Sequence, residues 1–221
     1  MFKSPQRTIF FILAGLFALW LGYALSGMLK KSRPEQRHEL VELLNGTALI
    51  GQEKPLPEFN LMGKDNQPFT LDNFKGYWSY VFFGYTHCPD ICPTTLQVMN
   101  QTLQQLAPDE AQGVFISVDP ERDTVEKIKA YVEYFNPDML GATGDPEAIS
   151  ALARSIGILY QRAENPASKE NYLVDHSASI LLINPRGELA AVLSPPLDPK
   201  NLAADLRTVK RLTIKRLTMG R

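Results

Sequence analysis

The chain has 221 residues, of which 44% are hydrophobic, and its formal net charge is −1. This length accommodates one domain of ordinary size and an additional segment, and the composition provides enough apolar side chains for a buried core. Because the chain carries no large excess of basic residues, the composition argues against a nucleic acid as its partner.

An apolar segment lies close to the N-terminus. Residues 8–29 form a run of 22 residues without a charge. As a helix rising about 1.5 Å per residue, this run reaches about 33 Å and crosses a hydrocarbon core of about 30 Å. A cleaved signal peptide is the alternative, but the apolar core of a signal peptide has only about 7–15 residues. We therefore predict that residues 1–7 form a cytoplasmic N-terminus and that residues 8–29 form a retained transmembrane anchor.

The charges flanking this segment give an orientation that differs from the one we adopt. Lys3 and Arg7 precede the span, whereas Lys30, Lys31 and Arg33 follow it directly. The positive-inside tendency taken alone would leave the large domain in the cytoplasm. The bias is small once the terminal amine is counted, and a resemblance described below implies the opposite side. The polar residues 30–45 are predicted to be a tether.

Short apolar runs and amphipathic segments alternate after the tether. The predicted strands are 47–50, 59–62, 80–85, 113–119, 157–164, 177–184 and 189–193, and the predicted helices are 94–106, 124–135, 145–155 and 197–210. This order implies a parallel crossover joined to an antiparallel hairpin. We predict an α/β domain over residues 46–210, with a thioredoxin-like mixed sheet flanked by helices, and a basic C-terminal tail over residues 211–221.

Particular residues predict where the helices begin. Asp123 is predicted to cap the helix over residues 124–135, and Asp145 is predicted to cap the next helix, with Pro146 at its first position. After the cysteines, regular helix is predicted to start at Pro93, because a proline further inside the helix would remove a hydrogen bond. The residues before Pro93 are then a tight loop.

Both cysteines of the chain, Cys88 and Cys92, lie in this loop with three residues between them. They follow the central strand 80–85, at the edge where open α/β sheets bind ligands. Helix N-terminal amides favour anions, so we expect both thiols to ionise more readily than free cysteine, whose pKa is about 8.5. The spacing leaves three uses open, namely a disulfide bond, thiol exchange and a metal site. A third ligand from elsewhere would suit Cu(I), whereas a closed zinc site needs four ligands.

The three histidines are the candidates for that third ligand. His38 lies in the predicted tether, where we expect a solvated side chain. His87 adjoins Cys88, and we expect it to tune the thiols rather than to bind a metal. His176 comes directly before the predicted strand 177–184, where it is either bonded to backbone or a ligand.

Three segments together resemble one family. They are "YTHCPDICPTTL", "ISVDPERDT" and "YLVDHSASILLINPRGEL", in this order. They closely resemble the Sco/SenC family of membrane-anchored copper proteins with a thioredoxin-like fold. The resemblance covers about residues 57–206, and the joint occurrence of the three segments is more specific than the cysteine pair alone.

The resemblance implies a ligand set and a function. It implies that Cys88, Cys92 and His176 bind copper, as Cu(I) or Cu(II). It also implies that the protein delivers copper or reducing equivalents for assembly of the copper A centre of cytochrome c oxidase. The expected partners are then the copper A subunit, a copper-donating chaperone and a thiol reductase. The expected location is the inner membrane, in a single pass, with the domain facing the periplasm.

The residues around His176 fit this resemblance. Thioredoxin-like reductases keep a cis-proline in this loop, but residues 172–178 contain no proline. Asp119 and Asp175 are candidates to orient His176, because a ligating histidine usually donates the N–H of its other ring nitrogen to a carboxylate or a carbonyl. For Asp119, capping of the turn after the predicted strand 113–119 is an equal alternative. The alternative function is a thiol-disulfide oxidoreductase that uses Cys88 and Cys92 as its redox pair. A peroxide-reducing relative would need a threonine at the position of Tyr85.

Overall fold

The computed structural model describes residues 13–24, 39–163 and 172–219, and the chain divides into two units, Met1–Arg37 and His38–Arg221. In the first unit, residues 13–24 are helical. Within the described residues, no helix combines the length and the apolar character that a membrane crossing requires. Both ends of the predicted anchor and most of the predicted tether lie outside the described residues, so the anchor stays a prediction.

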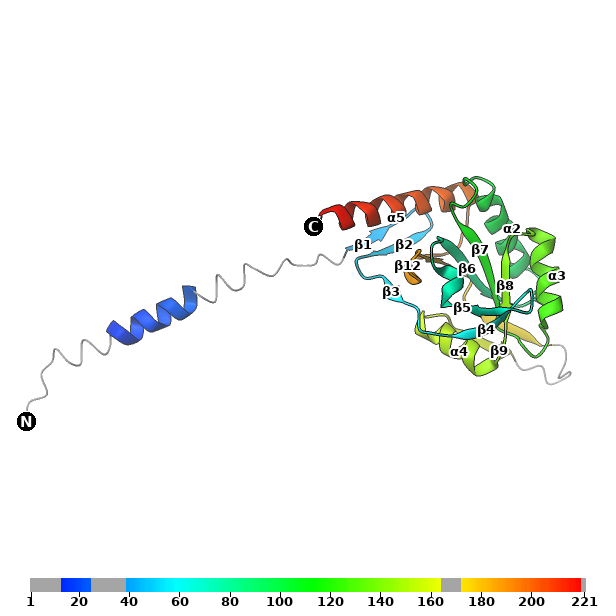
Figure 1. The fold of residues 1–221 in the computed structure, drawn as a ribbon, viewed down its shortest axis with the longest axis horizontal. Coiled ribbons are helices and arrows are strands. Elements are labelled where there is room, and N and C mark those ends of the chain that lie inside the picture. Colours follow the sequence, from blue (N-terminus) through cyan, green and yellow to red (C-terminus); the bar gives the residue numbers. More distant parts are fainter. Residues whose placement is uncertain (1–12, 25–38, 164–171, 220–221) are drawn as a thin grey trace, which may run out of the picture. The chain divides into compact units, whose positions relative to one another are not determined.

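The second unit is built on a ten-stranded mixed sheet and a separate two-stranded sheet (Figure 1). Its strands are β1 Glu39–Glu42, β2 Gly46–Ile50, β3 Lys54–Pro55, β4 Asn60–Gly63, β5 Pro68–Thr70, β6 Ser79–Gly84, β7 Gln112–Ser117, β8 Leu140–Thr143, β9 Tyr160–Ala163, β10 Leu173–His176, β11 Ile180–Ile183 and β12 Glu188–Leu193. The large sheet has the order β1-β2-β12-β11-β6-β7-β8-β4-β5, and β3 pairs with β12. The predicted mixed sheet is confirmed, because β6, β7 and β8 are parallel whereas β11 and β12 form an antiparallel hairpin.

Helices cover this sheet. They are the short 3₁₀ helix η1 Leu71–Phe74 and the α-helices α2 Ile91–Leu103, α3 Val125–Phe135, α4 Pro146–Ser155 and α5 Pro199–Met219. Helix α2 contacts α3 and α5, whereas α4 packs near β4. In Figure 1, α5 lies at the top of the domain and α4 at the bottom. The crossovers through α2 and α3 join neighbouring parallel strands, which is the usual role of helices in such sheets.

The central strand β6 is buried along its whole length. It lies between β11 and β7, so both of its edges are hydrogen-bonded. A strand covered on both faces is expected to be continuously apolar, as the sequence YVFFG is. The carboxyl end of β6 leads directly to the cysteine loop, so the most buried strand of the sheet positions the candidate site.

Two boundaries differ from the sequence prediction. The predicted tether extends to residue 45, but Glu39–Glu42 forms β1, which pairs with β2. The predicted tail begins at residue 211, but α5 continues to Met219. Both segments contain few buried side chains, so apolar periodicity identified neither of them.

Helix α2 begins two residues earlier than predicted, at Ile91 rather than at Pro93. Pro93 is therefore the third helical residue. The first four amides of a helix have no partner within it, so a proline there removes no hydrogen bond. Cys92 consequently lies in the first turn, and the first hydrogen bond of the helix runs from the amide of Thr94 to the carbonyl of Asp90.

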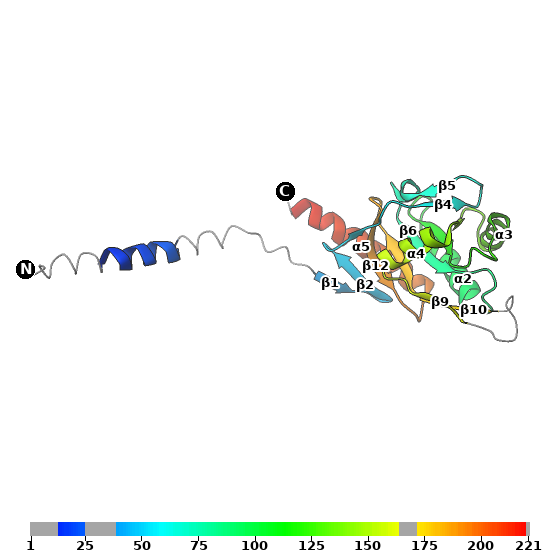
Figure 2. The same cartoon turned by 90° about the horizontal axis from the view of Figure 1, so that it is seen from below.

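The predicted strand over residues 157–164 is shorter than expected, and it does not join the main sheet. Strand β9 pairs with β10 alone, and these two strands lie side by side (Figure 2). Strand β10 was not predicted, since His176 was expected in a loop. The register places His176, the last residue of β10, opposite Tyr160, the first residue of β9.

Candidate metal centre

The two thiols come from the junction of β6 and α2. Cys88 is partly exposed and Cys92 is fully buried, and neither forms a disulfide bond. The amide of Cys92 donates a hydrogen bond to Cys88 Sγ over 3.3 Å. This contact places the amide end of the helix against one of the two sulfur atoms, as expected for a helix N-terminus.

Gly84, the last residue of β6, makes room for the buried sulfur. A Cβ atom at this position would lie 2.8 Å from Cys92 Sγ and 3.0 Å from the rings of Phe82 and Phe115. These distances are shorter than van der Waals contact. A side chain at this position would therefore displace Cys92 or the rings of Phe82 and Phe115.

Asp123 holds the cysteine loop, a role that the sequence analysis missed. It was predicted to cap α3, but the cap is Thr124, whose hydroxyl accepts a hydrogen bond from the amide of Lys127. The buried Asp123 carboxylate instead accepts hydrogen bonds from the amide and hydroxyl of Thr86, over 2.9 and 2.6 Å, and from the Ser117 hydroxyl over 2.6 Å. It therefore joins the end of β7 to the loop that carries Cys88.

His176 reaches the thiols from the other side. Its ring makes edge-to-face contacts with Phe82 and Tyr85, with centroids 5.6 and 5.9 Å apart. Its Nδ1 lies 3.1 Å from the carbonyl oxygen of Ser177. A carbonyl only accepts, so we assign the ring proton to Nδ1. Nε2 then carries the lone pair, and it lies 3.3 Å from Cys92 Sγ.

The sulfur atoms of Cys88 and Cys92 and a ring nitrogen of His176 all lie within 4.8 Å of one another. In the part of the chain that the structure describes, this is the one group of three His, Cys, Asp or Glu side chains that converges in this way. Two thiol sulfurs and an imidazole nitrogen are soft or borderline donors, which suit Cu(I) and zinc better than magnesium or calcium. The three donors do not complete a closed structural zinc site.

These observations place the chain in a family. A model of the SCO1/SenC family matches residues 48–211. The chain belongs to the SCO1/SenC family.

Relatives and solved structures agree with this assignment. The chain is 36% identical over 192 residues to the mitochondrial SCO2 homolog of Mus musculus, which covers 84% of this chain and 72% of that protein. It is similar to the crystal structure of Arabidopsis thaliana ScoI with copper bound, with a TM-score of 0.65 and 36% identity over 70% of this chain and 97% of that one. Bradyrhizobium japonicum ScoI with copper bound matches with a TM-score of 0.64 and 33% identity, over 70% of this chain and 99% of that one.

One expectation about the Sco/SenC thiols is wrong for Cys92. Helix amides were expected to make both thiols ionise readily, but burial raises the pKa of Cys92 well above that of free cysteine. Burial also lowers the pKa of His176 below its ordinary value of 6.5. Burial shifts the two pKa values in opposite directions for the same reason, because removal from water disfavours the thiolate of Cys92 and the imidazolium of His176. In the metal-free site, the Cys92 thiol and the His176 imidazole are therefore both neutral.

The carboxylates expected to orient His176 do not do so. Asp175 is exposed, and the partner of Nδ1 is the backbone carbonyl of Ser177. Asp119 is buried, and it accepts a hydrogen bond from the Tyr172 hydroxyl over 2.6 Å and another from Nε of Arg122. Because Tyr172 directly precedes β10, this contact secures the strand that carries His176 rather than the imidazole itself.

The other two histidines lie outside the donor group. His87 is exposed, and its Nδ1 lies 3.1 Å from the Thr86 hydroxyl and 3.8 Å from the Asp123 carboxylate. It therefore lies in the cysteine loop next to Cys88. His38 lies outside the described residues.

Proposed function

We propose that this chain is a membrane-anchored copper carrier that binds one copper ion through Cys88, Cys92 and His176 Nε2 and gives it up during assembly of the copper A centre of cytochrome c oxidase. The observation that carries the proposal is the convergence of these three donors within 4.8 Å. Membership of the SCO1/SenC family and the copper bound in two similar structures support it.

The chemistry of the donors favours copper as cargo. Two thiolates and one neutral imidazole give a three-coordinate set that suits Cu(I). Binding must displace the proton from the buried Cys92 thiol, and the metal offsets the cost of that charge. A three-donor set leaves room for an incoming ligand of a partner. Cys88 is the partly exposed sulfur, so we propose that transfer begins there.

The membrane topology forms part of the same proposal. Residues 8–29 are proposed to anchor the chain in the inner membrane, with the domain facing the periplasm. Free thiols there are oxidised unless a metal or a reducing partner protects them, so the proposal includes a thiol reductase as a partner. Protease added to spheroplasts should degrade the domain, whereas protection of the domain would overturn this topology.

A second candidate function rests on the same pair of free thiols. Cys88 and Cys92 are close enough for the amide of one to contact the sulfur of the other, and neither is disulfide-bonded. As a thiol-disulfide oxidoreductase, the metal-free protein would reduce a partner's disulfide and become oxidised between Cys88 and Cys92. Replacement of His176 would leave this activity unchanged.

Copper titration of the reduced full chain separates the two functions. The wild type should bind one Cu(I), and Cys88→Ser, Cys92→Ser and His176→Ala should each weaken binding by about 100-fold or more, because even outer-shell changes cost about 10–100-fold. His87→Ala is the matched control, since this exposed imidazole adjoins Cys88 but lies outside the donor group.

The outcomes are distinct. If all three ligand variants kept the wild-type affinity, the copper site would be wrong. If the reduced, metal-free protein reduced a disulfide substrate equally well with and without His176, the oxidoreductase would become the better description. Absorption in the thiolate-to-Cu(II) charge-transfer region provides a second readout of the sulfur ligands.

A further inference from the structure

From Arg207 onward, the exposed face of α5 presents a positively charged stripe, which we call the basic stripe. It consists of Arg207, Arg211, Ile214, Lys215 and Thr218, all of them exposed. Ile214 and Lys215 are adjacent, and the other steps along the stripe are three or four residues, so all five side chains lie along one face of the helix. Residues 207–221 contain six Lys or Arg and no Asp or Glu, although the whole chain has a net charge of −1. Positive charge is therefore concentrated at this end of the molecule.

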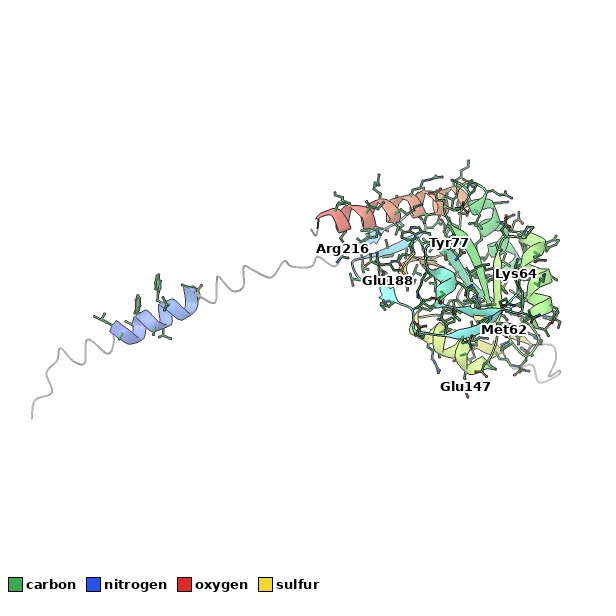
Figure 3. The ribbon with its side chains drawn as sticks, viewed as in Figure 1. Met62, Lys64, Tyr77, Glu147, Glu188 and Arg216 are labelled. Atoms are coloured by element: carbon green, nitrogen blue, oxygen red, sulfur yellow. The ribbon has the colours of Figure 1, made fainter. Side chains whose placement is uncertain are left out.

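The basic stripe lies beside the place where the domain begins. Arg216, labelled near the end of α5 in Figure 3, has its Nη1 atom 3.6 Å from the carboxylate of Glu53 and its guanidinium over Gly51. The residue before Gly51 is Ile50, which pairs with Glu39 at the start of β1. The end of α5 and the first residue of the first strand are thus held close together.

A buried contact fixes the same helix to the far end of this hairpin. The carboxylate of Asp205, on the buried face of α5, accepts hydrogen bonds from the amides of Leu44 and Asn45 over 2.9 and 2.8 Å. These amides belong to the turn between β1 and β2. Because α5 contacts both ends of the hairpin, the basic stripe has a fixed position relative to the strand at which the tether enters.

Chain length limits how far this strand can lie from the membrane. The predicted anchor ends at residue 29 and β1 begins at Glu39, so nine residues separate them. Nine extended residues reach at most about 32 Å, at about 3.3–3.6 Å each. The anchor that the proposed function assigns to residues 8–29 would therefore keep the start of β1, and with it the end of α5, near the lipid headgroups.

We propose that the basic stripe of α5 binds anionic lipid headgroups of the membrane that holds the anchor. The inference rests on the anchor of the proposed function. Cations close to an anionic surface are attracted to it, and the exposed Ile214 adds apolar contact at the headgroup level. Two contacts, the tether and the stripe, would then hold the domain in one orientation instead of leaving it free to rotate about the tether.

The test uses lysine labelling of the full chain in lipid nanodiscs. The copper-loaded protein is placed in discs of phosphatidylcholine alone or mixed with phosphatidylglycerol, and each lysine is quantified by mass spectrometry after an amine-reactive label. Lys215 should be labelled several-fold less in the anionic discs, and added salt should restore its labelling because salt screens surface charge. Lys200, exposed in the first turn of the same helix, should not change.

Two charge reversals complete the design. Arg211→Glu should remove the lipid dependence of Lys215 labelling, whereas Lys200→Glu, the matched control, should leave it intact. Equal labelling of Lys215 in both kinds of disc would overturn the inference. Protection of Lys215 only after addition of an acidic protein would assign the stripe to a protein partner instead.

Failure of the proposed function can be recognised separately. If the protein separated from the discs during chromatography, residues 8–29 would not be an anchor. Labelling of Lys215 in the presence of anionic vesicles would still show whether the basic stripe binds anionic lipid. Copper stoichiometry of the same samples reports on the metal site alone.

Discussion

Cys88 and Cys92 follow β6, the central strand of the large sheet, whereas His176 is the last residue of β10 in the two-stranded sheet. The cysteine loop follows the fully buried strand β6, and the carboxylate that restrains it is itself completely buried. Strand β10, in contrast, alternates exposed and buried residues and pairs only with β9. The two sulfur donors thus lie next to the core, and the nitrogen donor lies on an accessory element.

Different parts of the fold restrain the two sides of the site. The cysteine side is restrained by Asp123, and the histidine side is restrained by the contact between Tyr172 and Asp119. Asp119 and Asp123 lie in one short segment after β7, so this segment connects the two sides. Because β6 and Asp123 are buried whereas β10 is partly exposed, changes on the cysteine side should lower the free energy of unfolding more than changes on the histidine side.

The largest expected loss follows Asp123→Ala. It leaves the Thr86 and Ser117 donors without their acceptor, and each buried donor without a partner costs about 1–3 kcal/mol. We expect the free energy of unfolding to fall by about 3 kcal/mol and copper affinity to fall with it. Asp90→Ala is the control, because Asp90 is exposed and its side chain makes no capping hydrogen bond. Chemical denaturation and copper titration measure both effects, and equal stability of the two variants would remove Asp123 from this role.

Gly84→Ala tests the packing of the buried sulfur. The added methyl group would lie 2.8 Å from Cys92 Sγ, and overpacking of this kind costs about 1–3 kcal/mol. We expect a stability loss of about 2 kcal/mol together with weaker copper binding. Gly113→Ala is the matched control, because its methyl group meets the flexible ends of Leu103 and Met139, away from the sulfurs. Unchanged copper binding in Gly84→Ala would show that Cys92 can move without harm.

Tyr172→Phe should cost less, because it acts on the accessory side. It removes the hydroxyl that donates to Asp119, a loss of about 1 kcal/mol. The ring stays between the guanidinium groups of Arg122 and Arg162, each 3.5 Å from its centroid. Burial raises the pKa of Tyr172 to about 12, so the hydroxyl donates at neutral pH. Tyr134→Phe, at an exposed ring, is the control, and thermal denaturation is the measurement. A loss as large as that of Asp123→Ala would contradict the expectation that the histidine side contributes less to stability than the cysteine side.

The smallest expected effect is a pH dependence from His176. Burial lowers its pKa below the ordinary 6.5, so the unfolded chain binds this proton more readily than the folded chain. The resulting stability is present above about pH 6.5 and is lost as the pH falls below it. In metal-free protein, His176→Gln should flatten this decline in denaturation curves, whereas His87→Gln should not. An equal decline in His176→Gln would exclude His176 as its source.

Elements with strong periodicity could be predicted from sequence. Helix α3 was predicted over residues 124–135 and spans Val125–Phe135, and α4 has Asp145 as its cap, as predicted. The edge strand β1 and the accessory strand β10 were missed, because too few of their residues are buried to produce a pattern. Weak burial therefore limits prediction at the edges of this fold.

The site shows the same division. The resemblance identified the three residues that the structure brings together. It did not identify Asp123, since an aspartate before a helix is more often a cap. A signal was nevertheless present, because Asp123 follows a buried strand that ends at Ser117, and two polar residues there can meet the neighbouring loop. A single sequence does not reveal which segments contact one another, so the contact between Asp123 and Thr86 could not be predicted from it.

The separation of the ligands along the chain also affects how the site matures. Cys92 precedes His176 by 84 residues. At about 5–20 residues per second, a ribosome needs roughly 4 to 17 s to add this stretch. During that interval the growing chain carries both thiols but lacks the imidazole of His176. The thiols of Cys88 and Cys92 are therefore present before the group that includes His176 can form, so a chain with the proposed function has to keep both sulfurs reduced until His176 has been added.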